Sequence, residues 1–343
     1  LTELRHLRFE GTVPTALRTV QARVALEDSD FLSVQGIALE VLGGSIELHR
    51  SQFPPPFGGR PAVLLDSTQF PQQAHRIAES YFAAGNSLGA SLELRRAGLP
   101  PARGNIGLFD NVFAGGNSRA IRLNSSRAWL EGNVFLQYHG DSNTPPATAI
   151  ELGGTQFGPS AATCIRNAFI QCDTAVLCTD AGAAVLTQST FVDVGRSAST
   201  GVAARGIVSV APSSAPATHG RHIRIDASIA ARCGPVALRE EALDSALACT
   251  DSILSVPWTG PGTGNQVREA WLRHLPSLSE ARFTSWSEAQ QVWTWLAPMP
   301  GSPGIRTSPS GRDAGAAIPA GLAISPLLPA ITPATSAIFK VGP

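Results

Sequence analysis

The sequence is poor in charge and in several residue types that mark particular functions. Only 15% of its 343 residues are charged, and 26 basic residues balance 26 acidic ones to a net charge of zero. There is one lysine, Lys340, and one methionine, Met299. Nucleic acids and anionic membranes attract proteins with excess positive charge, so we expect neither as a partner.

Long apolar runs are missing as well. No segment approaches the roughly 20 apolar residues that span a membrane, so we expect no membrane insertion. The chain opens at Leu1 without a secretory signal. We interpret it as a processed protein or as part of a longer chain or assembly.

The few cysteines lack the spacing of metal ligands. They are Cys164, Cys172, Cys178, Cys233 and Cys249. We expect buried free thiols, and a disulfide between Cys172 and Cys178 is the alternative in a secreted protein.

What the sequence does contain is a repeat. Nine segments align on one column, and they end at Phe31, Phe53, Phe82, Phe113, Phe135, Phe169, Phe191, Ala230 and Leu254. The residue two places before this column is always Ser or Asn, and the residue five places before it is always apolar. Such self-similarity is typical of a repeat architecture.

A second unit lies between these segments and has apolar residues at alternate positions. Its copies begin at Gly36, Ala62, Ser91, Ala120, Ala149, Ala175, Gly206 and Pro235. Alternation indicates strands with one buried face. The shortest repeat, from Phe31 to Phe53, is 22 residues long. It leaves no room for a crossover helix, so the pattern predicts a parallel β-helix whose rungs lie about 4.8 Å apart. Stacked Ser and Asn side chains would form a hydrogen-bonded ladder at one bend.

Over residues 1–262 the sequence resembles the right-handed parallel β-helix proteins of the pectin-lyase-like superfamily. The phrase "GSPGIRTSPSGRDAGA", Gly301 to Ala316, and the tail after it are similar to large secreted bacterial proteins that join β-helices to lamin-tail-like and spore-coat-kinase-like domains. The resemblance implies an all-β, right-handed parallel β-helix of about nine to ten rungs. It also implies an extracellular or cell-surface location. Lyases, hydrolases, adhesins and inert stalks share this fold, so function must come from a site.

We predict three regions. The β-helix covers residues 1–262, a helical and loop capping region covers 263–315, and residues 316–343 are a tail or the start of a following β domain. Stretches from Asn265 and from Ser285 have helical apolar spacing and carry Trp271, Trp286, Trp293 and Trp295. Short helices of this kind would cap the open end of the solenoid. A sugar-binding tryptophan platform is the alternative.

The repeat register predicts which charges are neighbours, because one column on successive rungs places side chains about 5 Å apart. The expected ion pairs are Asp28 with Arg50, Arg50 with Glu79, Glu47 with Arg76, Asp66 with Arg95, Glu93 with Arg122, and Arg122 with Glu151. Pairs of this kind help to fix the register.

One pair breaks the pattern, since Glu79 and Asp110 fall in the same column on consecutive rungs. Stacked like charges repel unless a cation or a shared proton relieves them, so these two are candidate Ca²⁺ ligands. The candidate ligand-binding residues around and including them are Glu79, Tyr81, Phe109, Asp110, Trp129, Glu131, Tyr138, His139 and Asp141. Aromatic rings beside carboxylates suit a glycan groove on the flank. The alternative is that Arg50 shields Glu79 and that the rings pack under a loop.

Two classes of function remain open. The first is a non-catalytic extracellular module, structural, adhesive or glycan-contacting, whose partner is a polysaccharide or another surface protein. The second is a polysaccharide lyase or glycoside hydrolase acting in a groove along the flank. The repeat array has no lysine and no compact run of aspartates, and His139 and His219 stand alone in loops. We therefore favour the non-catalytic module and predict no catalytic residue, and Ca²⁺ is the sole cofactor that the pattern suggests.

Overall fold

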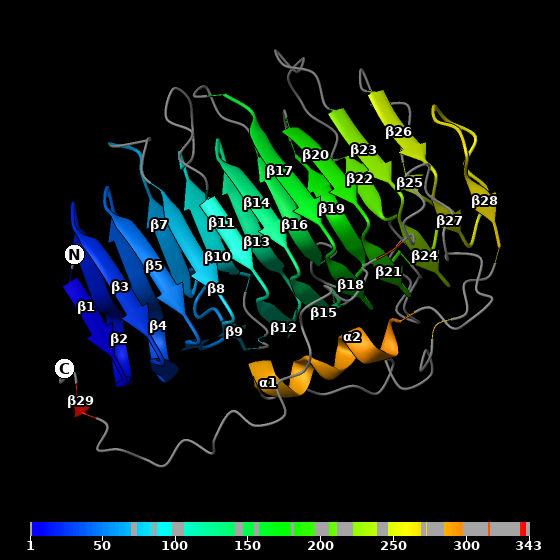
Figure 1. The fold of residues 1–343 in the computed structure, drawn as a ribbon. Coiled ribbons are helices and arrows are strands. Elements are labelled where there is room, and N and C mark those ends of the chain that lie inside the picture. The colour runs from blue at the N-terminus through cyan, green and yellow to red at the C-terminus, as the bar shows by residue number, and fades with distance from the viewer. Residues whose placement is uncertain are drawn as a thin grey trace.

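The computed structural model is an all-β solenoid of stacked parallel strands, which confirms the predicted parallel β-helix (Figure 1). It describes residues 2–69, 74–83, 85, 88–97, 106–140, 147–153, 158–179, 182–195, 206–210, 222–238, 246–268, 272, 285–297, 315 and 337–340. Each complete coil passes through three stacks of strand, which we name face A, face B and face C.

Face A is a ten-stranded sheet. Its strands are β1 (Thr2–Arg5), β3 (Arg23–Glu27), β5 (Ser45–His49), β8 (His75–Ala78), β11 (Ile106–Phe109), β14 (Arg127–Glu131), β17 (Ser160–Ile165), β20 (Gly182–Thr187), β23 (His222–Asp226) and β26 (Ala246–Thr250). The inward column that the sequence predicted to be apolar is buried here, from Leu26 to Cys249.

Faces B and C belong to one nineteen-stranded sheet, because the long strands β2 (Leu7–Val20) and β4 (Asp30–Leu42) run through both. Face B continues with β6 (Gln52–Phe53), β9 (Tyr81–Phe82), β12 (Val112–Gly116), β15 (Val134–Tyr138), β18 (Ala168–Ile170), β21 (Thr190–Val192), β24 (Ile229–Ala231), β27 (Ile253–Leu254) and β28 (Gln266–Val267). Face C continues with β7 (Val63–Asp66), β10 (Ala90–Arg95), β13 (Arg119–Asn124), β16 (Thr148–Gly153), β19 (Thr174–Cys178), β22 (Val208–Val210) and β25 (Ala237–Leu238).

The Phe column forms a stack of rings through the core. Consecutive rings lie 4.4–5.2 Å apart and within 19° of parallel, in the order Phe9, Phe31, Phe53, Phe82, Phe113, Phe135, Phe169 and Phe191. Phe9 adds one rung before the first segment that the sequence repeat identified. Stacked rings bury a large apolar area and fix the lateral position of each coil.

The bend between faces A and B is a left-handed turn followed by the Ser/Asn column. The turn residue has a φ of 43–54° on rung after rung, as at Glu79 and Asp110, and is a glycine at Gly132. The next side chain accepts a hydrogen bond from the backbone N–H of its counterpart one rung earlier, as from Asn111 to Asn133 Oδ1 at 3.0 Å. Asn133 donates in turn to Asn167 Oδ1 at 2.9 Å. These groups are fully buried, so the ladder satisfies polar atoms that would otherwise be unpaired.

The ladder ends three residues beyond the predicted array. The backbone N–H of Ser252 donates to Asn265 Oδ1, and Gln266 pairs with Ile253 of β27. The helix that the sequence predicted from Asn265 is therefore wrong at its start, because β28 continues the solenoid there. Local apolar spacing favoured a helix, and stacking on an existing rung outweighed it.

The second predicted helical stretch does form short helices, α1 (Trp286–Ala289) and α2 (Gln291–Trp295). They differ from the expectation in place, since they pack along face B rather than over the open end of the solenoid (Figure 1). From the fourth coil on, many outward residues of face B are apolar, and the buried side chains of the helices pack against them. None of the helices in the described part of the chain is long and apolar enough to cross a membrane.

The remainder of the C-terminal region is described at two places. The backbone N–H of Gly315 donates to the carbonyl of Ala227, and β29 (Ala337–Lys340) pairs in parallel with β2 of the first coil. The other residues of 298–343 lie outside the described residues. The predicted boundary between residues 315 and 316 therefore stays a prediction.

All five cysteines are buried and free, so the predicted free thiols are confirmed and the disulfide between Cys172 and Cys178 is wrong. Burial raises the pKa of Cys164 to about 12, which keeps this thiol protonated and unreactive.

Asn111→Leu should lower the free energy of unfolding by about 2–4 kcal/mol, because it removes the acceptor of the Ser80 N–H and the donor to the Ile77 carbonyl. Asn111→Ser is the matched control, since the repeat itself uses Ser at Ser80 and Ser189. It should cost less than half as much. Chemical denaturation measures both, and equal stability of the leucine variant and the native chain would contradict the ladder.

Candidate functional site

Five of the nine predicted ligand residues lie together on face A or at the bend that ends it. Phe109, Trp129 and Glu131 are on β11 and β14, and Glu79 and Asp110 occupy the left-handed turns after β8 and β11. Consecutive coils bring these positions side by side, as the register Phe109 to Glu131 shows.

The aromatic part of this site is built around a missing side chain. Gly107 stands between Arg76 and Trp129 in one outward column of face A. The ring of Phe109 folds back over this gap, where a Cβ on Gly107 would lie 2.2 Å from a ring atom. The Arg76 guanidinium lies 5.0 Å from the centre of the Phe109 ring. We call Arg76, Phe109 and Trp129 the aromatic strip.

Trp129 is the exposed member of the strip, with 41% of its surface accessible. Its indole Nε1 donates to Glu131 Oε2 at 3.1 Å, and Glu131 forms an ion pair with Arg166 on the next coil. This chain of contacts holds the indole in one orientation and engages the carboxylate. The strip therefore presents a fixed ring with little loose charge beside it.

Asp110 is a partly buried carboxyl with a raised pKa. The pKa of Asp110 is raised from 3.8 to about 6, first by burial and then by the nearby charges of Glu79 and Glu131, while Arg166 opposes the increase. The predicted repulsion between Glu79 and Asp110 is therefore present, and burial contributes more than this repulsion to the raised pKa of Asp110. Gly132 leaves room for the carboxyl, since a Cβ there would lie 2.1 Å from Asp110 Oδ1.

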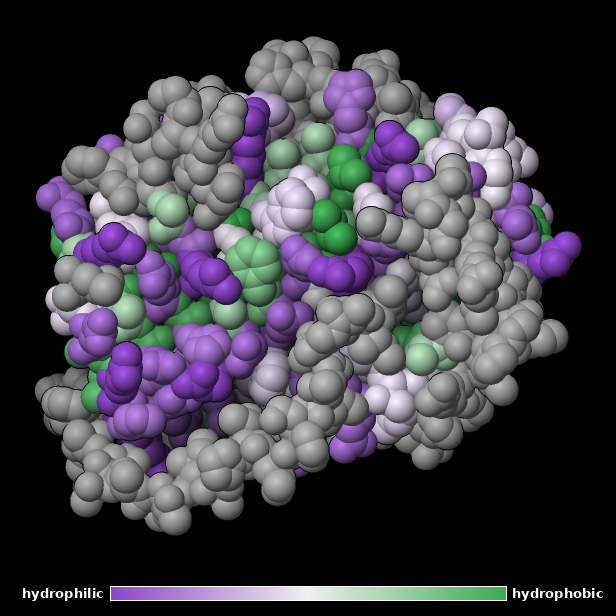
Figure 2. All heavy atoms as spheres, in the orientation of Figure 1, coloured by the Kyte–Doolittle hydropathy of each residue, from purple (hydrophilic) through white to green (hydrophobic). Residues whose placement is uncertain are grey.

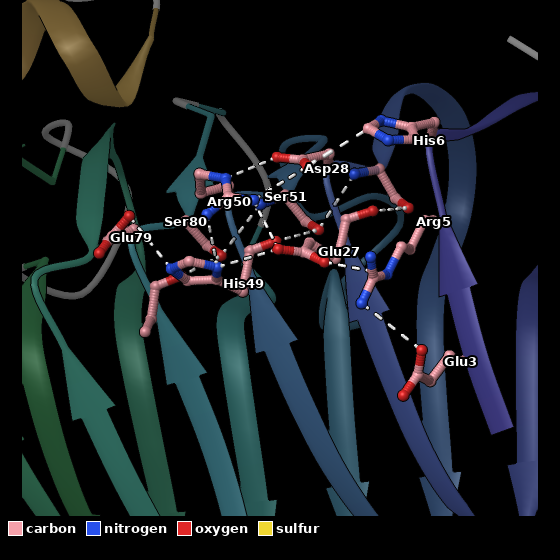
Figure 3. Close-up of polar contacts among 12 residues, drawn as sticks. Glu3, Arg5, His6, Glu27, Asp28, His49, Arg50, Ser51, Glu79 and Ser80 are labelled. Carbon is pink, nitrogen blue, oxygen red and sulfur yellow. Dashed lines mark hydrogen bonds and ion pairs between the residues drawn. The ribbon is translucent and has the colours of Figure 1, made fainter. Parts of the chain in front are cut away.

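Glu79 has a partner that the sequence reasoning missed. His49 Nε2 lies 3.1 Å from the Glu79 carboxylate, and the other ring nitrogen, Nδ1, lies 3.6 Å from Glu27 (Figure 3). Arg50, which was expected to shield Glu79, binds Asp28 at 2.7 Å and Glu27 instead. His49 occupies the same repeat position as Phe109 and Glu131. The alignment of the repeats could therefore have identified His49 as a neighbour of Glu79.

Of the other predicted ion pairs, some form and some do not. Asp28 with Arg50 and Arg122 with Glu151 at 3.3 Å are confirmed. Glu47 binds Arg23, so the expected partner Arg76 is wrong. Arg95 forms its ion pair with Glu93 within its own strand, and Asp66 acts on it as a nearby charge that helps to raise its pKa. Glu93 also accepts from Asn124 on the next coil, in place of Arg122. Long side chains reach neighbours on adjacent columns, which the register alone does not decide.

A shallow groove of about 390 Å³ adjoins the strip on the first four coils of face A. Small residues, Ala25 and Ala78, form part of its floor, and Arg76 is shared between its wall and the aromatic strip. Its charged lining includes Arg5, Glu27 and His49, which are joined by ion pairs (Figure 3). Hydrophilic side chains gather over this N-terminal part of the molecule in the surface view (Figure 2).

The remaining predicted residues do not join the site. Tyr81 is buried on face B beneath the C-terminal helices, and Tyr138 is buried in the core, where its hydroxyl lies 3.4 Å from Ser91 Oγ. His139 bonds to Asp173 at 3.1 Å at the bend between faces B and C. The structure therefore does not bring these three residues to the aromatic strip, because Tyr81 and Tyr138 are buried elsewhere and His139 lies at another bend. Asp141 lies outside the described residues.

The described residues contain no cluster of three or more His, Cys, Asp or Glu side chains that could hold a metal ion. Glu79 and Asp110 alone offer fewer ligands than Ca²⁺ prefers, so a cation here would need further oxygens from backbone or water. The Ca²⁺ site stays a hypothesis.

No protein-family model, no curated protein and no solved structure matches this chain. The strand pairing itself therefore carries the statement that the fold is a parallel β-helix.

Asp110→Asn should stabilise the protein above pH 6. The folded-state pKa of Asp110 lies above its usual value of 3.8, so the stability contributed by the protonated carboxyl is lost as the pH rises through about 6. The variant keeps a neutral group at every pH. Its melting temperature should exceed that of the native chain by ~2–4 °C at pH 7.5 and match it at pH 4.5. An advantage that does not depend on pH would contradict this origin.

The Ca²⁺ hypothesis predicts that millimolar Ca²⁺ raises the melting temperature of the native chain by mass action and leaves Asp110→Asn unchanged. Mg²⁺ at the same concentration controls for ionic strength. Equal responses of the two proteins to Ca²⁺, or no response in either, would exclude the site.

Proposed function

We propose that this β-helix is a non-catalytic, glycan-contacting module of an extracellular or cell-surface protein. The observation that carries the proposal is the aromatic strip, an exposed Trp129 beside a Phe109 ring that caps Gly107 on a flat sheet face. Pyranose rings present apolar C–H faces that pack on aromatic rings, while their hydroxyls need charged or polar partners at the edge.

The strip meets both needs with side chains that are already ordered. Arg76 lies over Phe109, and Glu131 binds the indole N–H of Trp129. Ordered side chains lose little conformational entropy on binding, so even a small contact area gives useful affinity. The groove beyond Arg76 offers carboxylates and guanidinium groups to further sugar units along the same face.

The resemblance to pectin-lyase-like proteins of secreted bacterial chains supports the location and the choice of a polysaccharide over a small molecule. In such a setting the rigid solenoid would also serve as a structural or adhesive segment. Another surface protein is the alternative partner.

One observation favours the enzymatic alternative, a lyase or glycoside hydrolase. A carboxyl with a pKa of about 6, such as Asp110, is suited to general acid catalysis near neutral pH. Against it, the nearest stacked carboxylate, Glu79, is engaged by His49, so the two do not form a free acid and base pair. We therefore prefer binding without turnover.

Trp129→Ala should bind at least tenfold more weakly than the native chain to whichever polysaccharide the native chain binds. A tenfold loss corresponds to about 1.4 kcal/mol of binding free energy. Val185→Ala is the matched control, since Val185 is a similarly exposed apolar residue, at 39%, on the same face. Affinity electrophoresis against neutral and uronate polysaccharides, followed by calorimetry, measures the effect. Equal losses in both variants would contradict the strip as the binding site.

The same panel distinguishes the two functions. Binding without release of reducing or unsaturated ends supports the module. Cleavage that disappears in Asp110→Asn or Glu79→Gln would establish the enzyme instead.

A further inference from the structure

The outward side of face B changes character along the solenoid. On the first three coils the residue before the stacked Phe is polar or charged, at Arg8, Asp30 and Gln52. From the fourth to the ninth coil, the residues flanking the stacked position point outward, and all but Thr190 are apolar. We call this set the face B strip, which consists of Tyr81, Val112, Ala114, Val134, Leu136, Ala168, Ile170, Val192 and Ala231.

Residues 285–297, which we call the strap, cover this strip (Figure 1). The strap buries Ala289, Val292, Trp293 and Leu296 against it, and Trp286 and Trp295 pack at the edges. The spacing of Trp286, Ala289, Trp293 and Leu296 is that of one helical face. The strap therefore meets the strip as an amphipathic helix meets an apolar groove.

Polar contacts anchor the strap at its N-terminal end. Trp286 Nε1 donates to the Asp110 carbonyl at 2.5 Å, and Ser285 caps α1 by accepting from the Glu288 N–H at 3.3 Å. The charge of Glu288 is felt by Tyr81, whose pKa is raised by burial and then by this carboxylate. The anchor thus joins the strap to the fourth and fifth coils, where the strip begins.

The strap helices have four and five residues, far fewer than an isolated helix needs in water. Their structure must come from the strip. The strip, by contrast, is built from strands that pair with coils on both sides and stack on the Phe column, so its structure does not depend on the strap. One partner is preformed and the other folds on it, which is how a binding surface and its helical ligand behave.

We propose that the face B strip is a binding site for an amphipathic helix, and that the strap fills it as a tethered ligand which a free helix of the same sequence can replace. The partner chemistry is a helix with a bulky aromatic residue, a small residue three places on, and bulky apolar residues seven and ten places on. Replacement would release the Asp110 carbonyl from Trp286 and uncover Tyr81. This inference does not rest on the proposed glycan function.

The test uses the full chain and a labelled synthetic peptide of residues 284–298. Val292→Asp places a charge on the buried side of the strap, and Gln291→Asp places the same charge on the exposed side one residue earlier. A tether gives the native strap an effective concentration of the order of millimolar, so low-micromolar peptide should not displace it. We expect Val292→Asp to bind the peptide at least tenfold more tightly than the native chain or Gln291→Asp.

Hydrogen exchange on the native chain gives an independent measurement. The strap amides should exchange at least tenfold faster than those of β12, β15 and β18, because the strap opens while the strip stays paired. Equal protection of strap and strip would overturn the proposal, as would peptide binding that is equal or absent in all three proteins. Loss of the β-sheet circular dichroism in Val292→Asp would also overturn it, since the strap would then be part of the solenoid core.

Discussion

The structure depends on one hydrogen bond repeated along the solenoid, from the backbone N–H at the bend to the Ser or Asn side chain on the next coil. The residue before it adopts a left-handed conformation that costs non-glycine residues on the order of 1 kcal/mol, so each bend needs compensation. The ladder supplies it, because each side chain accepts from the backbone N–H of the preceding coil and also donates to a carbonyl. Asn133 accepts from Asn111 and donates to Leu108 of that coil. A Ser hydroxyl donates within its own coil, as Ser80 does to Ala78. A one-residue slip would leave a row of buried amides unpaired. The bend therefore fixes the register of all three faces.

The fixed register turns a repeat in sequence into columns in space, and the candidate site is a local departure from those columns. Where a column would carry a side chain, Gly107 leaves a gap that the Phe109 ring fills, and Gly132 leaves a gap that the Asp110 carboxyl fills. Gly107 follows from the demand of its neighbour alone, since it has ordinary extended backbone in β11. Gly132 meets a similar demand and also has the positive φ, 69°, of its bend. A scaffold this rigid can therefore hold a side chain in an unusual place at small entropic cost.

The sequence predicted the inward columns well because burial and the ladder leave few choices there. The Phe, Leu and Ser/Asn positions repeat, and each is buried as expected. It predicted the outward contacts less well, since an Arg or Glu reaches two columns and the choice of His49 for Glu79 depends on geometry. Tyr81 and Tyr138 show the same limit. The sequence pattern predicted both side chains to be exposed, but the C-terminal helices cover Tyr81 and the core encloses Tyr138. The strap could have been anticipated, because strands apolar on both faces require a cover.

The bend at Asp110 links the two surfaces that the chain offers. Phe109, whose ring belongs to the aromatic strip on face A, is the last residue of β11, and the carbonyl of the very next residue accepts the Trp286 N–H on face B. Backbone torsions at a left-handed bend are narrow, so a contact that holds the Asp110 carbonyl also restrains the peptide that carries Phe109. The carboxyl of Asp110, partly buried between these surfaces, adds a group whose protonation changes near pH 6. A single turn therefore couples the Phe109 ring, the partly buried carboxyl and the strap. No other described bend of the solenoid has both an aromatic ring before it and a strap contact at its carbonyl.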